Sequence, residues 1–190
     1  MNFIKTAIAD VIIIEPMVFG DERGYFIETF RQDKLDAFLG FKVNFVQDNE
    51  SKSCYGVLRG LHYQLAPASQ TKLVRVIKGK VLDVAVDIRT GSPTFGQHVS
   101  VELSEQNKRQ LFVPRGFAHG FVVLEDDTIF AYKVDNYYSP ENDRGLAFDD
   151  PSLAIDWLVD KEQLQLSAKD TRQPTLDNAE LFDNTSSLYA

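Results

Sequence analysis

The sequence predicts an all-β fold built as one barrel with a few short helices. Most of the 190 residues lie in short β-branched and aromatic segments separated by Gly, Pro, Asn and Asp. The helical period is weak over most of this length. No linker or repeat divides the chain, and its 44% hydrophobic residues can fill one core. We therefore expect a single domain over residues 1–190.

The expected elements follow one another from the N-terminus. The strands are Val11–Glu15, Tyr25–Phe30, Phe41–Val46, Gly56–Gln64, Lys72–Ile77, Val81–Ile88, His98–Leu103, Gln110–Val113, Phe117–Leu124 and Thr128–Val134. Arg31–Leu39 predicts a helix, with an apolar face and Gly40 as its stop. Short helices are expected over Pro151–Trp157 and Lys161–Leu166, and a loose tail over Asn184–Ala190. Residues 1–50 thus form a region of strands and helix, and residues 150–190 a helical C-terminal extension.

Two hairpins are expected to arrange polar side chains. A turn at Lys78-Gly79 would make Lys72 and Asp83 diagonal neighbours, on a face shared with valines and an alanine. The opposite face is also apolar, so alternation alone does not identify the interior face.

The second hairpin would run from Gly116 to Asp135. A two-residue turn at its centre would place Phe121 opposite Tyr132, with His119 close by on the same face. A three-residue turn would reverse that relation.

Charge and cysteine content exclude several classes of protein. Twenty Lys+Arg against twenty-eight Asp+Glu give a net charge of −8, which argues against binding to nucleic acid or an anionic membrane. Any anionic ligand must meet a local basic pocket. The single cysteine, Cys54, excludes a disulfide framework and a four-cysteine zinc site. No leader or membrane span is evident, so we expect a cytoplasmic protein.

Side chains that could bind an anion or transfer a proton lie in the segment 56–64. Arg59 and His62 interrupt what otherwise reads as a core strand. The two residues have opposite strand parity, so they can face one cavity only if the strand bends or bulges. Gly60, which lies between them, permits this.

Residues 47–64, QDNESKSCYGVLRGLHYQ, resemble the signature of the dTDP-4-dehydrorhamnose 3,5-epimerase family, whose members are cupin-type β-barrels. Further similar blocks lie at residues 19–30, 72–76 with 83–94, 114–121, 132–133 with 137–138, and 166–170. The resemblance implies a cupin-type jelly-roll β-barrel.

It also implies an activity: cofactor-independent inversion at C3 and C5 of dTDP-4-dehydro-6-deoxy-D-glucose, giving dTDP-4-dehydro-L-rhamnose in dTDP-L-rhamnose biosynthesis. The ketone at C4 acidifies both positions. By its match to the family, His62 is the base and Tyr132 the acid on the other face of the sugar. Lys72 would stabilise the enolate oxygen. Asp170 would orient His62, and Asp83 would hold Lys72 charged and aimed.

The resemblance also implies substrate-binding residues. The set comprises Arg23, Phe26, Glu28, Gln47, Asp48, Asn49, Arg59, Lys72, His119, Tyr138, Asp143 and Lys169. Arg23, Arg59 and His119 would bind the diphosphate, with His119 donating even when neutral. Tyr138 would stack on thymine. In this family the N-terminal strands cross between subunits, so a homodimer is implied in which Arg23, Phe26 and Glu28 serve the neighbouring site.

A metal is not expected. Along the motif of metal-binding cupins, Gln64 and Lys72 stand where two ligands would be, and an ammonium would repel a divalent cation. Two other functions stay open. One is a relative that inverts a single centre, or isomerises the ketone, on another nucleotide-linked keto-sugar. The other is a non-catalytic nucleotide-sugar-binding cupin, which would not need an opposed acid and base.

Overall fold

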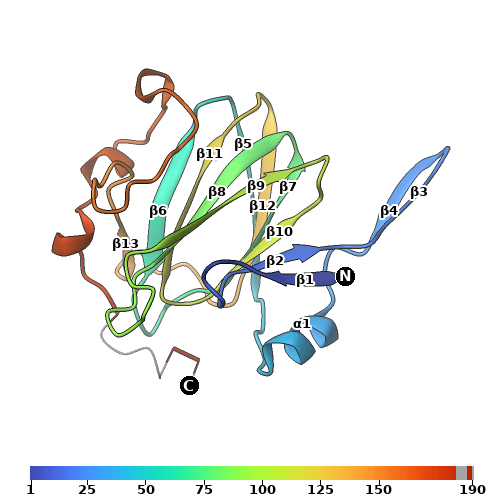
Figure 1. Cartoon of the computed structure of the whole chain (residues 1–190), viewed down its shortest axis with the longest axis horizontal. Helices are drawn as coiled ribbons and strands as arrows, with labels where there is room; N and C mark the ends of the chain where they lie inside the picture. The colour runs from blue at the N-terminus through green and yellow to red at the C-terminus, as the bar shows by residue number, and fades with distance from the viewer. Residues whose placement is uncertain (183–187, 190) are drawn as a thin grey trace.

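Two antiparallel sheets packed face to face make up the body of the computed structural model, which describes residues 1–182 and 188–189 (Figure 1). The six-stranded sheet has the order β1 (Asn2–Lys5), β2 (Ile12–Glu15), β10 (Gln110–Val113), β7 (Lys72–Lys78), β12 (Thr128–Val134), β5 (Gln47–Ser53). The five-stranded sheet has the order β13 (Asp143–Gly145), β6 (Leu58–Gln64), β11 (Phe117–Val123), β8 (Lys80–Asp87), β9 (His98–Ser104). The predicted all-β jelly roll is confirmed.

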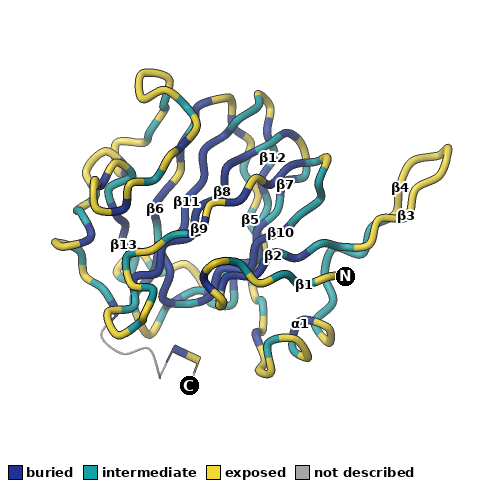
Figure 2. The backbone as a smooth tube through the Cα atoms, viewed as in Figure 1, coloured by how far each residue is buried: buried dark blue, intermediate teal, exposed yellow. Residues whose placement is uncertain are grey.

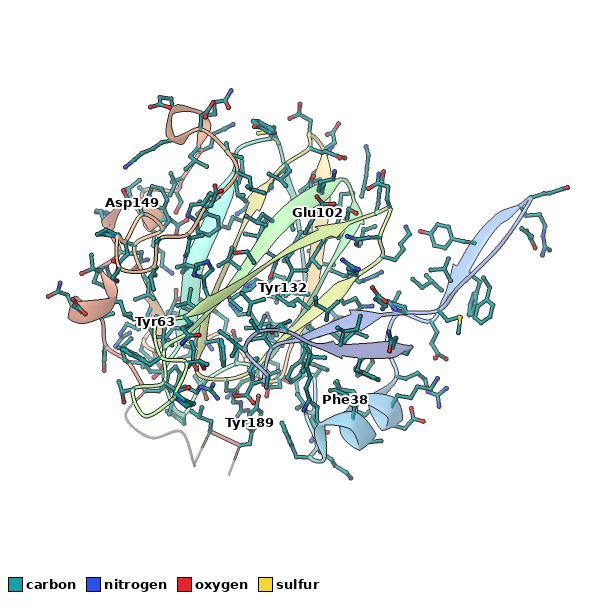
Figure 3. The ribbon with its side chains drawn as sticks, viewed as in Figure 1. Phe38, Tyr63, Glu102, Tyr132, Asp149 and Tyr189 are labelled. Carbon is teal, nitrogen blue, oxygen red and sulfur yellow. The ribbon has the colours of Figure 1, made fainter. Side chains whose placement is uncertain are left out.

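Apolar side chains form three layers rather than one. The first fills the interior between the sheets and includes Val74, Val81 and Phe130. The second lies on the outer face of the five-stranded sheet under the C-terminal segments, and the third lies on the outer face of the six-stranded sheet under α1. Apolar side chains therefore pack on both faces of strands such as β7 and β8, which explains why alternation could not identify the interior face. The labelled side chains in Figure 3 follow this division, with Tyr63 beside the C-terminal segments and Phe38 on α1.

The helix α1 (Gln32–Leu39) confirms the early helix prediction. It ends where Gly40 adopts φ 79°, and the Gly40 N–H donates to the Asp36 carbonyl at 2.9 Å. Leu35 on its apolar face is buried, and Phe38 stacks on Phe3 with ring centroids 4.6 Å apart.

Both predicted hairpins are wrong. β7 pairs with β10 and β12, whereas β8 pairs with β9 and β11. In the same way β11 and β12 lie in different sheets. At each connection the jelly-roll chain passes from one sheet to the other instead of folding back beside itself. The residues predicted to share a face still lie together: Val74, Val76, Val81 and Ala85 all belong to the interior cluster. They come from strands in facing sheets, and the inner faces of both sheets line the same interior.

Several element predictions also fail. β5 was not expected because its sequence, QDNESKS, has no apolar residue; the strand predicted over Phe41–Val46, just before it, is absent. β1, β3 (Val18–Asp21) and β13 were likewise missed. Residues 151–153 form a turn and residues 154–157 have no regular structure, so the helix predicted there is wrong. The C-terminal helices are 3-10 turns at η1 (Lys161–Gln163), η2 (Asp170–Arg172) and η3 (Leu176–Asn178).

A hairpin of β3 and β4 (Gly24–Ile27) extends away from the body, and almost all of it is exposed (Figure 2). At the other terminus, most of the predicted tail lies outside the described residues. Leu188 is buried, and the Tyr189 hydroxyl lies 2.8 Å from the Thr71 hydroxyl. Among the described residues, no helix has the length and apolar character needed to cross a membrane.

Candidate active site

A cavity of about 370 Å³ opens between the two sheets. It is lined by Asn49, Glu50, Ser51, Arg59, His62, Lys72, His119, Phe121, Phe130, Tyr132, Ser167 and Asp170. Seven of the predicted site residues are thus brought together: Asn49, Arg59, His62, Lys72, His119, Tyr132 and Asp170. They come from both sheets and from the C-terminal extension.

A bulge in β6 directs Arg59 and His62 into the same cavity, as predicted. The pairing of β6 with β11 shifts between His119, opposite His62, and Phe121, opposite Arg59. Gly60 has φ 129°, and a Cβ there would lie 2.5 Å from the Gly120 Cα. Only glycine fits this position, because its backbone is left-handed and touches the neighbouring strand.

His62 and Asp170 form a hydrogen-bonded pair. The His62 Nε2 lies 2.5 Å from the Asp170 Oδ1, and Asp170 is buried whereas His62 is partly open to the cavity. An ionised carboxylate only accepts hydrogen bonds, so the proton sits on Nε2 and the lone pair on Nδ1. Hydrogen bonds from His62 and Ser167, with the Lys169 charge, hold the pKa of Asp170 below its usual value, although burial alone would raise it.

His119 and Asp83 form a second, deeper pair. Both carboxylate oxygens of Asp83 lie 3.0 Å from the His119 Nε2, and both side chains are buried. Burial lowers the pKa of His119, and Asp83 opposes this shift only in part. A neutral His119 therefore donates its Nε2–H hydrogen bond to Asp83, and its Nδ1 is then an acceptor. In this geometry a neutral ring has no second N–H for a phosphate oxygen, and the binding of the diphosphate by His119 stays a prediction.

Lys72 lies between these two pairs. Its ammonium donates to the His62 carbonyl at 3.4 Å, and burial lowers the pKa of Lys72 to about 8 against the raising charge of Asp83. Asp83 was expected to hold Lys72 charged and aimed. Its charge raises the pKa of Lys72, while both of its oxygens accept from the His119 Nε2.

Tyr132 approaches from the six-stranded sheet, opposite the sheet that carries His62. Burial raises the pKa of the Tyr132 phenol, so the phenol keeps its proton at pH 7. Below it, Phe121 and Phe130 stack with centroids 4.0 Å apart and form an apolar floor.

Edge strand β5 supplies a polar wall. Its inward residues Gln47, Asn49, Ser51 and Ser53 alternate with exposed residues, and the Ser53 hydroxyl accepts from the Arg59 guanidinium at 3.1 Å. Gln47 donates to Asn49 at 2.8 Å but does not line the cavity.

Other predicted residues lie outside the cavity. Asp48 points to the other side of β5 and pairs with Lys133 at 2.8 Å. Tyr138 donates to Asp143 at 3.0 Å, and Lys169 pairs with the same carboxylate. Asp143 and Lys169 both shift the pKa of Lys72, so this cluster flanks the cavity on the Lys72 side.

The predicted N-terminal residues also lie elsewhere in this chain. Arg23 pairs with Asp21 inside the exposed β3–β4 hairpin, and Phe26 is 69% exposed. Glu28 pairs with Arg31 at 3.5 Å.

Sequence reasoning missed five lining residues: Glu50, Ser51, Phe121, Phe130 and Ser167. An alternation of Gln, Asn and Ser along 47–53 was a usable signal for the polar wall. Ser167, three residues before Asp170, was a usable signal for a carboxylate partner.

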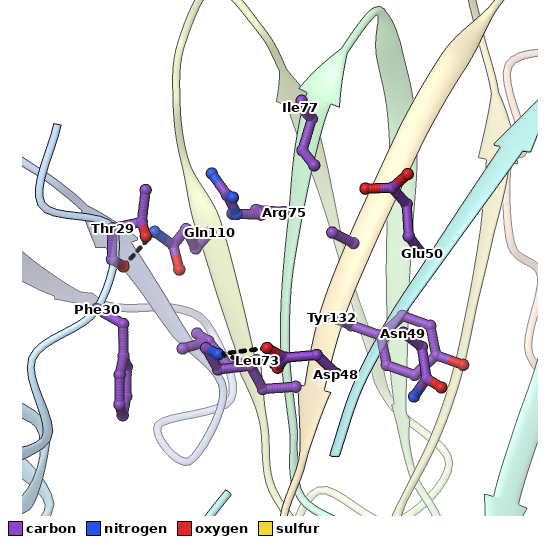
Figure 4. A pocket seen from close by; sticks show the side chains of 12 residues that line it. Thr29, Phe30, Asp48, Asn49, Glu50, Leu73, Arg75, Ile77, Gln110 and Tyr132 are labelled. Atoms are coloured by element: carbon purple, nitrogen blue, oxygen red, sulfur yellow. Dashed lines mark hydrogen bonds and ion pairs between the residues drawn. The ribbon is translucent and has the colours of Figure 1, made fainter. Parts of the chain in front are cut away.

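A second groove lies on the outer face of the six-stranded sheet (Figure 4). Lys133 bonds Asp48 there, and Gln110 donates to the Thr29 carbonyl at 2.7 Å. Tyr132 and Asn49, paired in register on β12 and β5, border both this groove and the cavity.

A histidine and a tyrosine that enter one cavity from facing sheets are side chains suited to moving protons, so the fold and the cavity together fit a proton-transfer enzyme built on a cupin-type jelly roll. A family model described as dTDP-4-dehydrorhamnose 3,5-epimerase matches residues 5–178, and the chain belongs to that family.

Individual relatives and solved structures support the same family assignment. A Shigella flexneri protein named dTDP-4-dehydrorhamnose 3,5-epimerase is 56% identical over 96% of this chain and 99% of the relative. A Legionella pneumophila 3,5-epimerase, solved in complex with dTDP-4-keto-L-rhamnose, superposes with TM-score 0.93 at 51% identity, covering 97% of this chain and 99% of that one. A 3'-monoepimerase from Streptomyces bikiniensis, in complex with dTDP-quinovose, has TM-score 0.86 and 33% identity, covering 91% and 87%.

Proposed function

We propose that this chain inverts C3 and C5 of dTDP-4-dehydro-6-deoxy-D-glucose without a cofactor, giving dTDP-4-dehydro-L-rhamnose. The observation that carries the proposal is the opposition of His62, on the five-stranded sheet, to Tyr132, on the six-stranded sheet, across one cavity. Inversion requires a proton to leave one face of a carbon and return to the other.

His62 acts as the base through Nδ1. Its Nε2–H is engaged by Asp170, which fixes the tautomer and stabilises the imidazolium formed when the proton arrives. The electron pair left on carbon moves into the C4 ketone and makes an enolate.

Lys72 stabilises the enolate oxygen. The ammonium is partly desolvated, and an electrostatic contact inside such a cavity is stronger than in water. Tyr132 then donates its phenolic proton to the carbon from the opposite face, and the enolate returns to the ketone.

The wall chemistry suits a 6-deoxy sugar attached to a diphosphate. The stacked Phe121 and Phe130 rings offer an apolar surface for the C6 methyl group. Arg59, held by Ser53, offers a charged donor to a phosphate oxygen, and Asn49 offers hydrogen bonds.

The working enzyme in this proposal is a homodimer. Arg23, Phe26 and Glu28 lie on or next to a hairpin that projects from the body, so they are available to a neighbouring cavity (Figure 1). Mixing Arg23→Ala with His62→Asn tests this, because a mixed dimer would contain one intact site. Recovered activity supports the arrangement, and no recovery in verified mixed dimers contradicts it.

One experiment tests the reaction. The protein is incubated with dTDP-4-keto-6-deoxyglucose in deuterated water, and deuterium at C3 and C5 is mapped by NMR. Uptake at both positions is expected. Uptake at one position would select the monoepimerase alternative, and uptake at neither would contradict catalysis on this substrate.

Tyr132→Phe tests the acid. The variant should lose epimerisation while retaining dTDP binding, since the ring and its packing are preserved. Near-normal turnover would refute the acid role. Retained activity after treatment with a chelator would test the expected independence from metal. Cytoplasmic localisation stays a prediction from the sequence.

A further inference from the structure

Ser167 closes the hydrogen-bond shell of the Asp170 carboxylate. Its hydroxyl donates to Asp170 Oδ2 at 2.8 Å, while Oδ1 faces His62 at 2.5 Å. The Asp170 N–H lies 3.2 Å from the Ser167 hydroxyl and 3.0 Å from the Ser167 carbonyl. Each carboxylate oxygen therefore has its own donor.

The hydrogen bond from Ser167 restrains an Asp170 side chain that regular secondary structure does not hold in place. Asp170 begins a three-residue 3-10 turn in the C-terminal extension, whereas His62 lies on a central strand. A side chain on a short turn is not fixed by sheet pairing, so its rotamer depends on local bonds. Ser167 supplies such a bond from the same turn.

We propose that Ser167 is a positioning residue for the proton-transfer step: its hydroxyl fixes the Asp170 rotamer and so holds the His62 ring in its working orientation and tautomer. This proposal rests on the proposed function. Ser167 Oγ contacts the carboxylate and not the imidazole, so the three residues do not form a nucleophilic serine triad.

Electrostatics support the same role. Asp170 is only 4% exposed, and a buried carboxylate tends to take up a proton. The groups that oppose this are His62 from β6, Lys169 from the same segment, and the Ser167 hydroxyl. Lys72 from β7 and His119 from β11 face the same cavity. Without the hydroxyl, the carboxylate would protonate at higher pH and stop supporting His62.

Ser167→Ala, Ser167→Thr and Thr171→Ala test the proposal. Thr171 is the matched control, because its hydroxyl bonds the Ala168 carbonyl of the same turn at 3.2 Å and does not touch Asp170. Ser167→Ala should lower kcat by about tenfold or more, with KM within about twofold, and change the pH profile of kcat/KM. Ser167→Thr should recover most of kcat, and Thr171→Ala should match the unmodified protein.

A substrate-free measurement separates this proposal from the proposed function. The Asp170 carboxyl is titrated by ¹³C NMR in the same variants. An upward shift of its titration in Ser167→Ala, absent in Thr171→Ala, supports the positioning role even if the keto-sugar is not turned over. An unchanged titration overturns it, as would equal effects of the two alanine substitutions on kcat and the pH profile.

Discussion

Two histidine–aspartate pairs share the cavity, and they are built differently. His119 and Asp83 lie on the paired strands β11 and β8, and both are buried. His62 lies on β6, but its partner Asp170 is 108 residues away in the C-terminal extension. One pair is fixed by the sheet, whereas the other is assembled from two parts of the fold.

The difference assigns separate tasks to chemically similar pairs. A base must exchange protons with substrate, and the His62 side chain is 31% exposed whereas that of His119 is 6% exposed. Burial lowers the pKa of His119, which suits a neutral ring that keeps one hydrogen bond. We therefore interpret His62–Asp170 as the reactive pair and His119–Asp83 as a fixed, buried polar pair at the same cavity.

Removal of the base should have the largest effect. His62→Asn should lower kcat by about 10³-fold or more, because general-base catalysis is lost while the cavity remains. Turnover measured by NMR, with dTDP affinity by calorimetry, checks this. If His119→Asn lowered kcat as much with dTDP binding intact, the division of tasks between the pairs would be wrong.

The two aspartates should differ in their effect on stability. Asp83→Asn should lower the free energy of unfolding by about 1–3 kcal/mol, since a buried charged acceptor is lost between strands. Asp170→Asn should lower the free energy of unfolding less than Asp83→Asn does, because Asp170 lies in the short turn η2 and not on a central strand. Its main effect should be a loss of kcat. Urea unfolding and turnover of both variants give the comparison. Equal losses of stability would remove the distinction.

The sheet-fixed pair was partly predictable from the sequence. Alternation placed Asp83 on the same strand face as Val81 and Ala85, without showing that this face is the interior one, and the motif at 114–121 contained His119. The partner was mistaken, because the turn at Gly79 reads as a hairpin locally, whereas jelly-roll closure carries β8 into the other sheet. Which strands pair depends on packing of the whole chain, and residues near the turn do not encode it.

The assembled pair was predictable only through the family resemblance. No spacing rule links His62 to Asp170, since tertiary contact joins them. Strand β5 shows the same limit. Its inward side chains face a polar cavity and its outward ones face water, so it lacks the apolar alternation by which strands are predicted.

The alkaline limb of kcat/KM should depend on the His119–Asp83 pair, because Asp83 raises the pKa of Lys72. Its ammonium must be charged to stabilise the enolate, and its pKa of about 8 predicts that kcat/KM falls as pH rises through that value. Asp83 raises this pKa, with Asp143 acting in the same direction and Lys169 against it. Asp83→Asn should move the alkaline limb to lower pH. A limb that stays in place would show that Lys72 does not set it.

Acid pH should act on stability through the buried pair. The pKa of His119 is lower in the folded protein than the usual 6.5, so the unfolded chain binds more protons between these two values. Stability should therefore decline as pH falls below about 6.5, until His119 is protonated in both states. Urea unfolding at several pH values measures this slope, and His119→Asn should reduce it. If His119→Asn left the dependence of the free energy of unfolding on pH unchanged, other titratable groups would be its cause.

The smallest effect is expected at Cys54, which touches neither pair. It is exposed in the connection between β5 and β6, and its sulfur lies 3.7 Å from the Gln165 amide nitrogen. Because such a contact is weak, Cys54→Ser should change the free energy of unfolding by no more than about 0.5 kcal/mol and leave kcat intact. A large loss of activity would mean that the β5–β6 connection controls the bulge at Gly60, and with it the direction of His62. The orientation of His62 on β6 would then depend on the preceding loop, as the orientation of Asp170 depends on the turn that carries Ser167.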